Sequence, residues 1–344
     1  MHRPAAPTDT LADLAPHFRG ANTLFVLSHA GPDGDALGAA IGLALGLQSL
    51  GKQAVAVFAE VPTRYDFLGV GPYSGACRVV DPAGAEAAEI LSNSDLGVLV
   101  DASEPSRAGE FESAFVASSC AKVCIDHHLA ERRPEYVGHV VEPGSASTGQ
   151  LVLGLLDLLG VSLDRPMAEA LFVAMATDTG WFRYTNTTPA VLEMAARLLG
   201  YGLEPDLLYR QIYDRISAAR LRLQGKVLAQ ARVELDGALV VSSVDRDLLE
   251  DSGLAVSDLE GVIDPLRTVE GSEVAALLTE RDPGEWKISL RSRGAADVAS
   301  IARRLGGGGP AMAAGARASG TREEVEQRLR EEVEIAVQAA RKGT

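Results

Sequence analysis

Aspartate and histidine residues gather at four places in the chain, each directly after an apolar segment. The four segments are His29-Ala30-Gly31-Pro32-Asp33-Gly34-Asp35, Val100-Asp101, Asp126-His127-His128 and Thr177-Asp178-Thr179-Gly180. Carboxylate oxygens mixed with imidazole nitrogens suit Mn²⁺, Mg²⁺ or similar ions, and no cluster of thiols accompanies them to indicate structural zinc. The residue types therefore predict a metal site.

The number of carboxylates indicates how many ions the site would hold. Asp33, Asp35, Asp101 and Asp178 together carry a charge of about −4, which matches two divalent cations. Two such ions clamp the attacking and leaving oxygens of a phosphoryl displacement, which favours a two-metal phosphoesterase. Each segment alone has a plainer explanation, because an aspartate after a strand commonly caps a helix and Asp126-His127-His128 could form a polar turn. All four segments follow apolar segments, however. Four unrelated caps or turns would not be expected to share this position, so a common metal site is favoured.

The apolar segments predict the elements that would bring these residues together. Short apolar runs alternate with helical stretches in the first half of the chain, which is typical of an α/β domain with a largely parallel sheet flanked by helices. Ligands bind such sheets at the carboxyl ends of the strands. We expect strands at 24–27, 54–58, 97–100 and 122–125, and helices at 36–50, 150–159 and 167–176.

The second half predicts a smaller α/β domain with a mixed sheet. Strands are expected at 238–244, 273–279 and 286–290, and helices at 297–305 and from Thr321, where Thr321-Arg322-Glu323-Glu324 fits a capping box. The predicted organisation is a metal-binding catalytic domain (1–190), a helical linker (191–226) and a substrate-binding domain (227–344), with the active site in the cleft between the domains.

Composition narrows the class of partner. The 344 residues contain 32 Lys and Arg against 47 Asp and Glu, a net charge of −15, which argues against a broad basic face for long duplex DNA. No apolar run is long enough to span a membrane, and residues 1–7 lack the apolar core of a signal peptide. Three cysteines do not make a disulfide framework, so we expect a cytoplasmic protein, with a homodimer as a candidate assembly.

The four segments resemble the motifs of the DHH phosphoesterase family, which is named for the triplet seen here as Asp126-His127-His128. The C-terminal part resembles the DHH-associated domain through Ile288-Ser289-Leu290-Arg291-Ser292 and the segment 306–315. Three further segments look like linking motifs of the nano-RNase (oligoribonuclease, NrnA-type) branch: Tyr65-Asp66-Phe67-Leu68, Ser147-Thr148-Gly149 and Phe182-Arg183-Tyr184-Thr185-Asn186-Thr187.

The resemblance implies a role for each residue of the metal site. One metal, Mn²⁺ in the first instance with Mg²⁺ or Co²⁺ as alternatives, would take His29, Asp33 and Asp101. A second would take Asp35, Asp101, His127 and Asp178. Asp126 would orient an imidazole, and His128 would face the scissile phosphate.

The resemblance also implies an activity. Members of this branch release 5′-mononucleotides from very short RNAs and linear dinucleotides such as pApA. Many of them also dephosphorylate 3′-phosphoadenosine 5′-phosphate. A substrate of two or three nucleotides agrees with the acidic composition, because it needs few cationic contacts.

Substrate contacts are predicted in the second domain. Arg291 and Arg293 follow a strand, and their guanidinium groups suit phosphate oxygens, although both could instead lie on a solvated strand edge. Gly307, Gly308 and Gly309 would cradle a ligand with backbone amides or form a flexible link.

Two features beside these contacts leave the substrate preference open. Pro310 stands where the family usually has a histidine, which removes one expected substrate contact. The aromatic residues Trp181, Phe182 and Tyr184 could stack a base or belong to the core.

Three other functions stay open. A DHH-type inorganic pyrophosphatase or polyphosphatase would share the metal ligands, although the glycine run and Arg291 favour a nucleotide. A RecJ-like single-strand DNA exonuclease would share the motifs but usually carries further DNA-binding domains. A nucleotide-binding module without turnover would be expected to lack metal ligands, and all six are present here.

Overall fold

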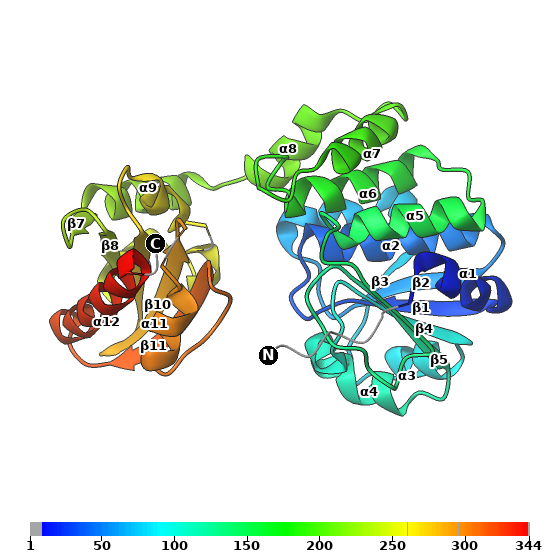
Figure 1. Ribbon diagram of the computed structural model, residues 1–344, viewed down its shortest axis with the longest axis horizontal. Helices are drawn as coiled ribbons and strands as arrows, with labels where there is room; N and C mark the ends of the chain where they lie inside the picture. The colour runs from blue at the N-terminus through cyan, green and yellow to red at the C-terminus, as the bar shows by residue number, and fades with distance from the viewer. Residues whose placement is uncertain (1–8, 260, 295, 343–344) are drawn as a thin grey trace. The chain divides into compact units, whose positions relative to one another are not determined.

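The computed structural model describes residues 9–259, 261–294 and 296–342. Contacts within the chain divide it after Arg215 into two units, which we describe separately. In Figure 1 the first unit runs from blue to green along the chain, and the second from yellow-green to red. Two of the helices in the predicted linker, α7 (Pro189–Leu199) and α8 (Pro205–Tyr213), lie in the first unit, and α9 (Ala218–Ala229) lies in the second. The predicted domain boundaries stay a prediction.

The first unit is an α/β layer structure. Its strands are β1 (Thr23–Leu27), β2 (Gln53–Phe58), β3 (Cys77–Val79), β4 (Leu96–Val100), β5 (Ala121–Asp126) and β6 (Gly138–Val141). Its remaining helices are α1 (Leu11–Gly20), α2 (Gly34–Ser49), α3 (Ala85–Ser92), α4 (Glu112–Ala117), α5 (Thr148–Leu159) and α6 (Arg165–Asp178), with 3₁₀ turns η1 (Thr63–Gly69), η2 (Gly71–Tyr73) and η3 (Pro105–Phe111). The strands form one sheet in the order β3-β2-β1-β4-β5-β6, and every pair is parallel. The predicted parallel α/β fold is confirmed.

Helices cover both faces of this sheet. Helices α2, α5 and α6 lie on one face and α3 and α4 on the other (Figure 1). Every residue of β4 is buried, as expected of a parallel strand between two helical layers. The central strands are therefore apolar along their whole length, and polar side chains are confined to the loops at their ends.

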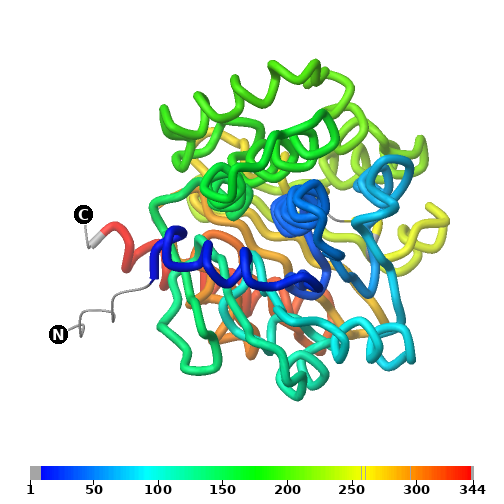
Figure 2. The backbone as a smooth tube through the Cα atoms, turned by 90° about the vertical axis from the view of Figure 1, so that its right-hand side faces the viewer, coloured from blue at the N-terminus to red at the C-terminus, as the bar shows by residue number. Residues whose placement is uncertain are grey.

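Four glycines allow α2 to pack closely on its neighbours. Gly34, Gly38, Gly42 and Gly46 recur every fourth residue, which places them on one face of the helix. A Cβ on Gly38 would lie 2.2 Å from the carbonyl oxygen of Ala170 in α6, and one on Gly34 would lie 2.4 Å from Oγ1 of Thr177. Figure 2 views α2 (blue) nearly end-on beside the green helices of the same layer. The glycines thus set how close the N-terminus of α2 lies to the C-terminus of α6.

The second unit contains a mixed sheet. Its strands are β7 (Arg232–Glu234), β8 (Leu239–Val244), β9 (Val274–Asp282), β10 (Glu285–Ser292) and β11 (Ala313–Ser319), in the order β11-β10-β9-β8-β7. Its other helical segments are α10 (Arg246–Ser252), η4 (Val256–Leu259), η5 (Asp264–Thr268), α11 (Val298–Arg304) and α12 (Arg322–Lys342). The pair β8 and β9 is parallel and the others are antiparallel, which confirms the predicted mixed sheet. The capping box at Thr321 is present, with Thr321 and Glu324 exchanging backbone-to-side-chain hydrogen bonds of 2.9 and 3.3 Å.

The N-terminal segment, the hydropathy of the helices, the cysteines and the end of β10 bear on predictions made from the sequence. The segment 1–7, where no signal peptide is predicted, lies outside the described residues. Within those residues, no helix is both long and apolar enough to cross a bilayer. The three cysteines are free thiols, Cys77 and Cys124 being buried and Cys120 partly exposed. Arg291 was predicted to follow a strand, but β10 continues to Ser292, so Arg291 lies inside it.

The glycine stripe of α2 yields a prediction about stability. We expect Gly38→Ala to lower the free energy of unfolding by about 1–3 kcal/mol, because the added methyl group overlaps the α6 backbone. Gly225→Ala in α9 is the matched control, since nothing lies within 4 Å of its Cβ position. There the higher helix propensity of alanine should raise stability by up to about 1 kcal/mol. Urea unfolding followed by circular dichroism measures both effects, and a Gly38→Ala protein as stable as the wild type would contradict this account of the packing.

Candidate metal centre

The predicted metal ligands meet at the carboxyl edge of the parallel sheet. His29 follows β1, Asp101 follows β4, and His127 follows β5, while Asp178 is the last residue of α6. The strand order reverses between β1 and β4, since β2 lies on one side of β1 and β4 on the other. Ligands of open α/β sheets bind at such a reversal. All six side chains predicted from the sequence therefore lie at the position where this fold places a site.

One group of potential ligands consists of His29, Asp33 and Asp101. Nε2 of His29 lies 3.4 Å from Oδ2 of Asp101 and 3.9 Å from Oδ1 of Asp33. The other ring nitrogen, Nδ1, lies 3.0 Å from the carbonyl oxygen of Ala30, to which it can donate only as N–H. That hydrogen bond places the lone pair of a neutral imidazole on Nε2, facing the two carboxylates.

A second group consists of Asp35, His127 and Asp178, with Asp101 between the two groups. Nε2 of His127 lies 3.6 Å from Asp101, 3.6 Å from Asp178 and 3.8 Å from Asp35. Nδ1 of His127 lies 3.3 Å from the carbonyl oxygen of Ser145, which again directs the ring so that Nε2 faces the carboxylates. Buried Nε2 has no hydrogen-bond partner in the described part of the chain.

The N-terminus of α5 holds the buried carboxylates in place. The backbone N–H groups of Thr148 and Gly149 donate to the two oxygens of Asp35 at 2.7 and 2.8 Å. The hydroxyl of Thr148 donates to Oδ1 of Asp101 at 3.0 Å. Unpaired amides and the positive end of the helix dipole favour negative charge at this position. These contacts were missed in the sequence, where Ser147-Thr148-Gly149 showed only a match to a family motif.

Local backbone structure positions two of the predicted ligands, Asp33 and Asp101. Asp33 caps α2, because its Oδ1 accepts hydrogen bonds from the backbone of Asp35 and Ala36. Asp101 has a φ of 58°, a left-handed conformation that a residue with a Cβ seldom adopts. Such backbone strain costs of order 1–3 kcal/mol and concentrates at functional sites. The strain turns the Asp101 carboxylate to a position from which it reaches both groups of ligands.

The third member of the triplet has a different environment. Nδ1 of His128 lies 2.9 Å from Oδ1 of Asp126, whose other oxygen accepts a hydrogen bond from Ser103 at 2.8 Å. The hydrogen bond to Asp126 is the main reason that the pKa of His128 is raised to about 9. Burial acts to raise the pKa of Asp126, but the hydrogen bonds from His128 and Ser103 hold it below its usual value. The His128 side chain is 60% exposed, so a charged imidazolium lies at the open side of the centre.

Burial and crowding make two of the carboxylates, those of Asp35 and Asp178, hard to ionise without a cation. Burial, and then the charges of Asp101 and Asp178, raise the pKa of Asp35 well above its ordinary value. Burial likewise raises the pKa of Asp178 to about 6. Burial acts to lower the pKa of His29, but the hydrogen bond to Asp101 outweighs it and raises that pKa.

These residues fit a divalent cation. Nε2 of each of the two imidazoles lies 3.4–3.9 Å from carboxylate oxygens, so a cation between them could be bound by both kinds of donor. The unpartnered Nε2 of His127 is the clearest sign, because a buried polar atom without a hydrogen bond is costly. None of the ligand groups contains a thiol, so the donors are those of Mn²⁺ or Mg²⁺ rather than of structural zinc.

The predicted substrate residues of the second unit do not form a cluster as compact as that of the predicted metal ligands. Arg291 lies 3.7 Å from Asp264 and keeps 30% of its side chain exposed, while Arg293 donates to the carbonyl oxygen of Val269 at 2.8 Å. A Cβ on Gly307 would lie 2.1 Å from the carbonyl oxygen of Gly315, and one on Gly309 2.7 Å from Cα of Ala314. Close packing against β11 therefore explains these two glycines, and ligand binding by Gly307, Gly308 and Gly309 stays a prediction.

The structure contains a basic pocket beside the glycine run, and the sequence did not predict that its three cationic residues come together. Arg281, Lys287 and Arg317 line a cavity of about 410 Å³ together with Gly306 and Gly307. Lys287 pairs with Arg317 across β10 and β11, so both project from the same face of the sheet. The strand alternation of β10, with Trp286, Ile288 and Leu290 buried, is the sequence signal that could have assigned Lys287 to this face.

Two of the three aromatic residues after Asp178, Trp181 and Phe182, are partly buried and pack against the core, whereas Tyr184 is 48% exposed. Trp181 and Phe182 have φ values of 60° and 62° and pack with their rings against Phe172. Asn186, from the same segment, donates to the carbonyl oxygens of Ala146 and Asp178 at 3.0 and 3.2 Å. The segment therefore ties the end of α6 to the start of α5.

A parallel sheet with carboxylates and imidazoles at its reversal point defines a metal-binding α/β protein, and comparisons with known proteins identify the family. Residues 23–176 match the DHH family N-terminal domain, and residues 236–339 match the DHHA1 domain. The chain is 37% identical over 302 residues to the bifunctional oligoribonuclease and PAP phosphatase NrnA of Thermus thermophilus. The matched residues make up 86% of this chain and 84% of that protein.

Two solved structures and one longer relative extend the likeness. An exopolyphosphatase-related protein from Bacteroides fragilis superimposes with a TM-score of 0.87 at 27% identity, over 99% of this chain and all of that one. RecJ of Thermus thermophilus, solved with Mn²⁺, shares the fold at a TM-score of 0.56 and 17% identity, over 96% of this chain and 55% of that one. The cyclic-di-AMP phosphodiesterase GdpP of Geobacillus thermodenitrificans is 29% identical over 90% of this chain but only 47% of its own length.

The chain belongs to the DHH family, with a DHHA1 domain as its second unit. It is accordingly a phosphoester hydrolase that depends on divalent metal, as the carboxylate and histidine groups at the sheet edge indicate. The resemblance found in the sequence is confirmed.

The raised pKa values predict how the metal-free protein responds to pH. Folding raises the pKa of Asp178 from 3.8 to about 6, so the stability that this group contributes is present below pH 3.8 and lost as the pH rises through about 6. We expect Asp178→Asn to be more stable than the wild type above pH 6 when metal is absent, and the difference to disappear near pH 4. The relevant quantity is the difference in stability between the variant and the wild type. Other groups, such as Asp126 with its lowered pKa, make the stability of both proteins depend on pH in the opposite direction.

Thermal unfolding in the presence of a chelator measures this difference. Adding Mn²⁺ at pH 7 to 100 times its dissociation constant should stabilise the wild type by about 2.7 kcal/mol and the variant by less. A variant that is less stable than the wild type without metal, or that gains as much from Mn²⁺, would contradict the arrangement of charges described above.

Proposed function

We propose that this protein hydrolyses very short RNA oligonucleotides and linear dinucleotides such as pApA to 5′-mononucleotides, and that it also dephosphorylates 3′-phosphoadenosine 5′-phosphate. The observation that carries the proposal is the two ligand groups at the reversal point of the sheet, with Asp101 lying 3.4 Å from His29 of one group and 3.6 Å from His127 of the other. The likeness to the NrnA oligoribonuclease over most of both chains supports the choice of substrate.

We assign one divalent cation to His29, Asp33 and Asp101 and a second to Asp35, Asp101, His127 and Asp178, with Mn²⁺ as the preferred ion. These residues fall into two of the groups whose ligand atoms lie within 4.8 Å of one another. The four carboxylates carry a charge of about −4, which two divalent ions would balance. When bound, such ions neutralise charge on the phosphate and supply an ionised water near neutral pH.

The chain's own residues would position and protonate the substrate. Asp126 accepts a hydrogen bond from Nδ1 of His128, which orients the ring. With a pKa of about 9, His128 is an imidazolium at neutral pH and presents positive charge at the open side of the centre. It can therefore donate a hydrogen bond to the phosphate or a proton to the leaving oxygen. Thr148 holds Asp101 so that the ligand shared by both groups does not rotate.

The second unit offers cations that suit phosphate. Arg281, Lys287 and Arg317 gather around one pocket in a protein whose net charge is −15. Together with Arg291 and Arg293 they would contact the few phosphates of a short substrate. The acidic balance of the rest of the chain favours such short substrates over long duplex DNA, for which more cationic contacts would be needed.

A panel of substrates tests the proposal. Activity with Mn²⁺ is compared on 5′-phosphorylated di- and trinucleotides, longer RNA, single-stranded DNA, 3′-phosphoadenosine 5′-phosphate and pyrophosphate. We expect mononucleotides from the di- and trinucleotides and slower cleavage of the longer chains. Phosphate release from pyrophosphate alone would favour the pyrophosphatase, and preference for long single-stranded DNA would favour the RecJ-like exonuclease.

The central role of Asp101 predicts the effect of removing one carboxylate charge. Asp101→Asn should reduce kcat on every substrate by at least about 10³-fold, because the carboxylate that lies near both His29 and His127 loses its charge. Asp206→Asn is the matched control, since Asp206 forms an exposed ion pair with Arg210 on α8. Steady-state kinetics with Mn²⁺ provides the measurement. An Asp101→Asn enzyme with near-normal kcat would exclude the assignment.

Position 310 allows a separate test of the second unit. Pro310 stands directly after the glycine run, at a place where the family usually has histidine. We expect Pro310→His to lower KM for a dinucleotide several-fold with little change in kcat, because it restores a hydrogen-bond donor. An unchanged KM would show that this position makes no contact with the substrate. Pro310→Ala, which adds no side-chain donor, is the control.

A further inference from the structure

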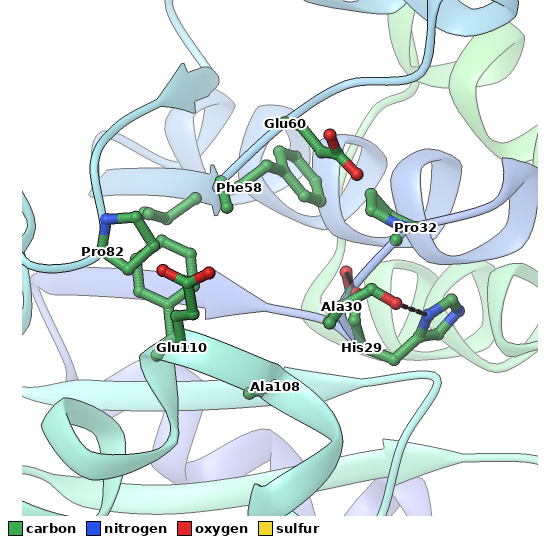
Figure 3. A pocket seen from close by; sticks show the side chains of 13 residues that line it. His29, Ala30, Pro32, Phe58, Glu60, Pro82, Ala108 and Glu110 are labelled. Carbon is green, nitrogen blue, oxygen red and sulfur yellow. Dashed lines mark hydrogen bonds between the residues drawn. The ribbon is translucent and has the colours of Figure 1, made fainter. Parts of the chain in front are cut away.

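A pocket of about 410 Å³ lies beside the metal centre, at the carboxyl ends of β1 and β2. Figure 3 shows that Phe58, Pro82 and Ala108 border it and that two carboxylates, Glu60 and Glu110, stand on different sides of it. His29, in the loop that follows β1, belongs both to the lining of this pocket and to the predicted metal ligands. In Figure 3 the ring of His29 points away from Phe58, while Ala30 and Pro32 form part of the pocket wall.

The loop that contains His29 is held firmly in place. The backbone N–H of Ala30 donates to the carbonyl oxygen of Arg107 at 2.7 Å. Gly109 has a φ of 61°, and a Cβ there would lie 2.7 Å from Cβ of Ala30. The η3 segment therefore packs directly against the His29 loop. Because His29 is common to the pocket lining and the predicted metal ligands, a molecule whose phosphate lies at the metal centre would have this pocket directly beside it.

The lining of the pocket indicates what kind of group it would accept. Its floor is apolar, with Val57, Phe58 and Phe111 buried in the protein. Glu60 and Glu110 are exposed, and neither makes a hydrogen bond or salt bridge in the described part of the chain. Two free carboxylates repel a phosphate and offer only acceptors, so the ligand must bring N–H or O–H donors. A flat ring with amino groups satisfies both the apolar floor and the acidic rim.

We propose that this pocket binds a nucleobase of the substrate and that Glu60 and Glu110 select bases with an exocyclic amino group. The inference rests on the proposed function, because it takes the reacting phosphate to lie at the neighbouring metal centre. Adenine, cytosine and guanine each carry an amino group that can donate to a carboxylate. Uracil has no exocyclic amino group, and its single edge donor, N3–H, lies between two carbonyl oxygens that would face negative charge. The site therefore disfavours uracil.

The four homodinucleotides pApA, pCpC, pGpG and pUpU test this selection in the full-length enzyme with Mn²⁺. We expect kcat/KM for pUpU to be about tenfold lower than for the other three. In the double variant Glu60→Gln/Glu110→Gln this difference should largely disappear, because a glutamine amide can donate to the uracil carbonyls. Glu112→Gln, on the neighbouring helix and outside the pocket lining, should keep the wild-type preference.

A dinucleotide analogue without bases separates recognition from catalysis. Its rate of hydrolysis should be the same in the wild type and in both sets of variants, because no base enters the pocket. Equal cleavage of all four dinucleotides by the wild type, or a preference that the double variant retains, would overturn the inference and leave the proposed function intact. If no dinucleotide is cleaved while another phosphoester is, the proposed function fails and this inference with it.

Discussion

The repulsion among acidic side chains at one buried edge is the constraint on which the site depends. Asp35 and Asp101 are almost completely inaccessible to solvent, yet they share a small volume with Asp33 and Asp178. Water cannot screen charges in such a place, so other groups must offset them. The amides of Thr148 and Gly149 do so in part, by hydrogen bonding to Asp35. The remainder calls for cations, and the Nε2 atoms of His29 and His127 lie close enough to the acids to bind the same ions.

Helix packing sets the distances in this cluster. Asp35 lies in the first turn of α2 and Asp178 in the last turn of α6, so their separation depends on how closely the two helices approach. Gly34 and Gly38 permit that approach, because a side chain at either position would overlap α6. A buried helix composed mainly of alanine, leucine and glycine thus has a functional consequence. It brings together carboxylates that charge alone would push apart.

The sequence predicted the strands that are apolar throughout and the acids that follow them. It did not predict β3, which is short and contains Arg78, or β11, whose alanines and glycine lack the bulky residues typical of strands. The six candidate metal ligands could be found in the sequence because their types and positions share one chemical explanation. Thr148 and Ser103 were not, since a hydroxyl that supports a carboxylate has no spacing or composition that distinguishes it from any other. The basic pocket was missed because Arg281, Lys287 and Arg317 come from different strands.

The distribution of charge links metal binding to substrate binding. Without cations, a phosphate at the sheet edge would meet four carboxylates, with His128 beside them as a countercharge. The two divalent ions proposed above would bring the cluster close to neutrality and leave His128 as an excess positive charge. Affinity for phosphate at this centre would then depend on bound metal, and linkage requires that a bound phosphate raise the affinity for metal by the same factor. The acidity of the protein, which by itself disfavours a nucleotide ligand, would thus be the means by which it acquires the cations that bind one.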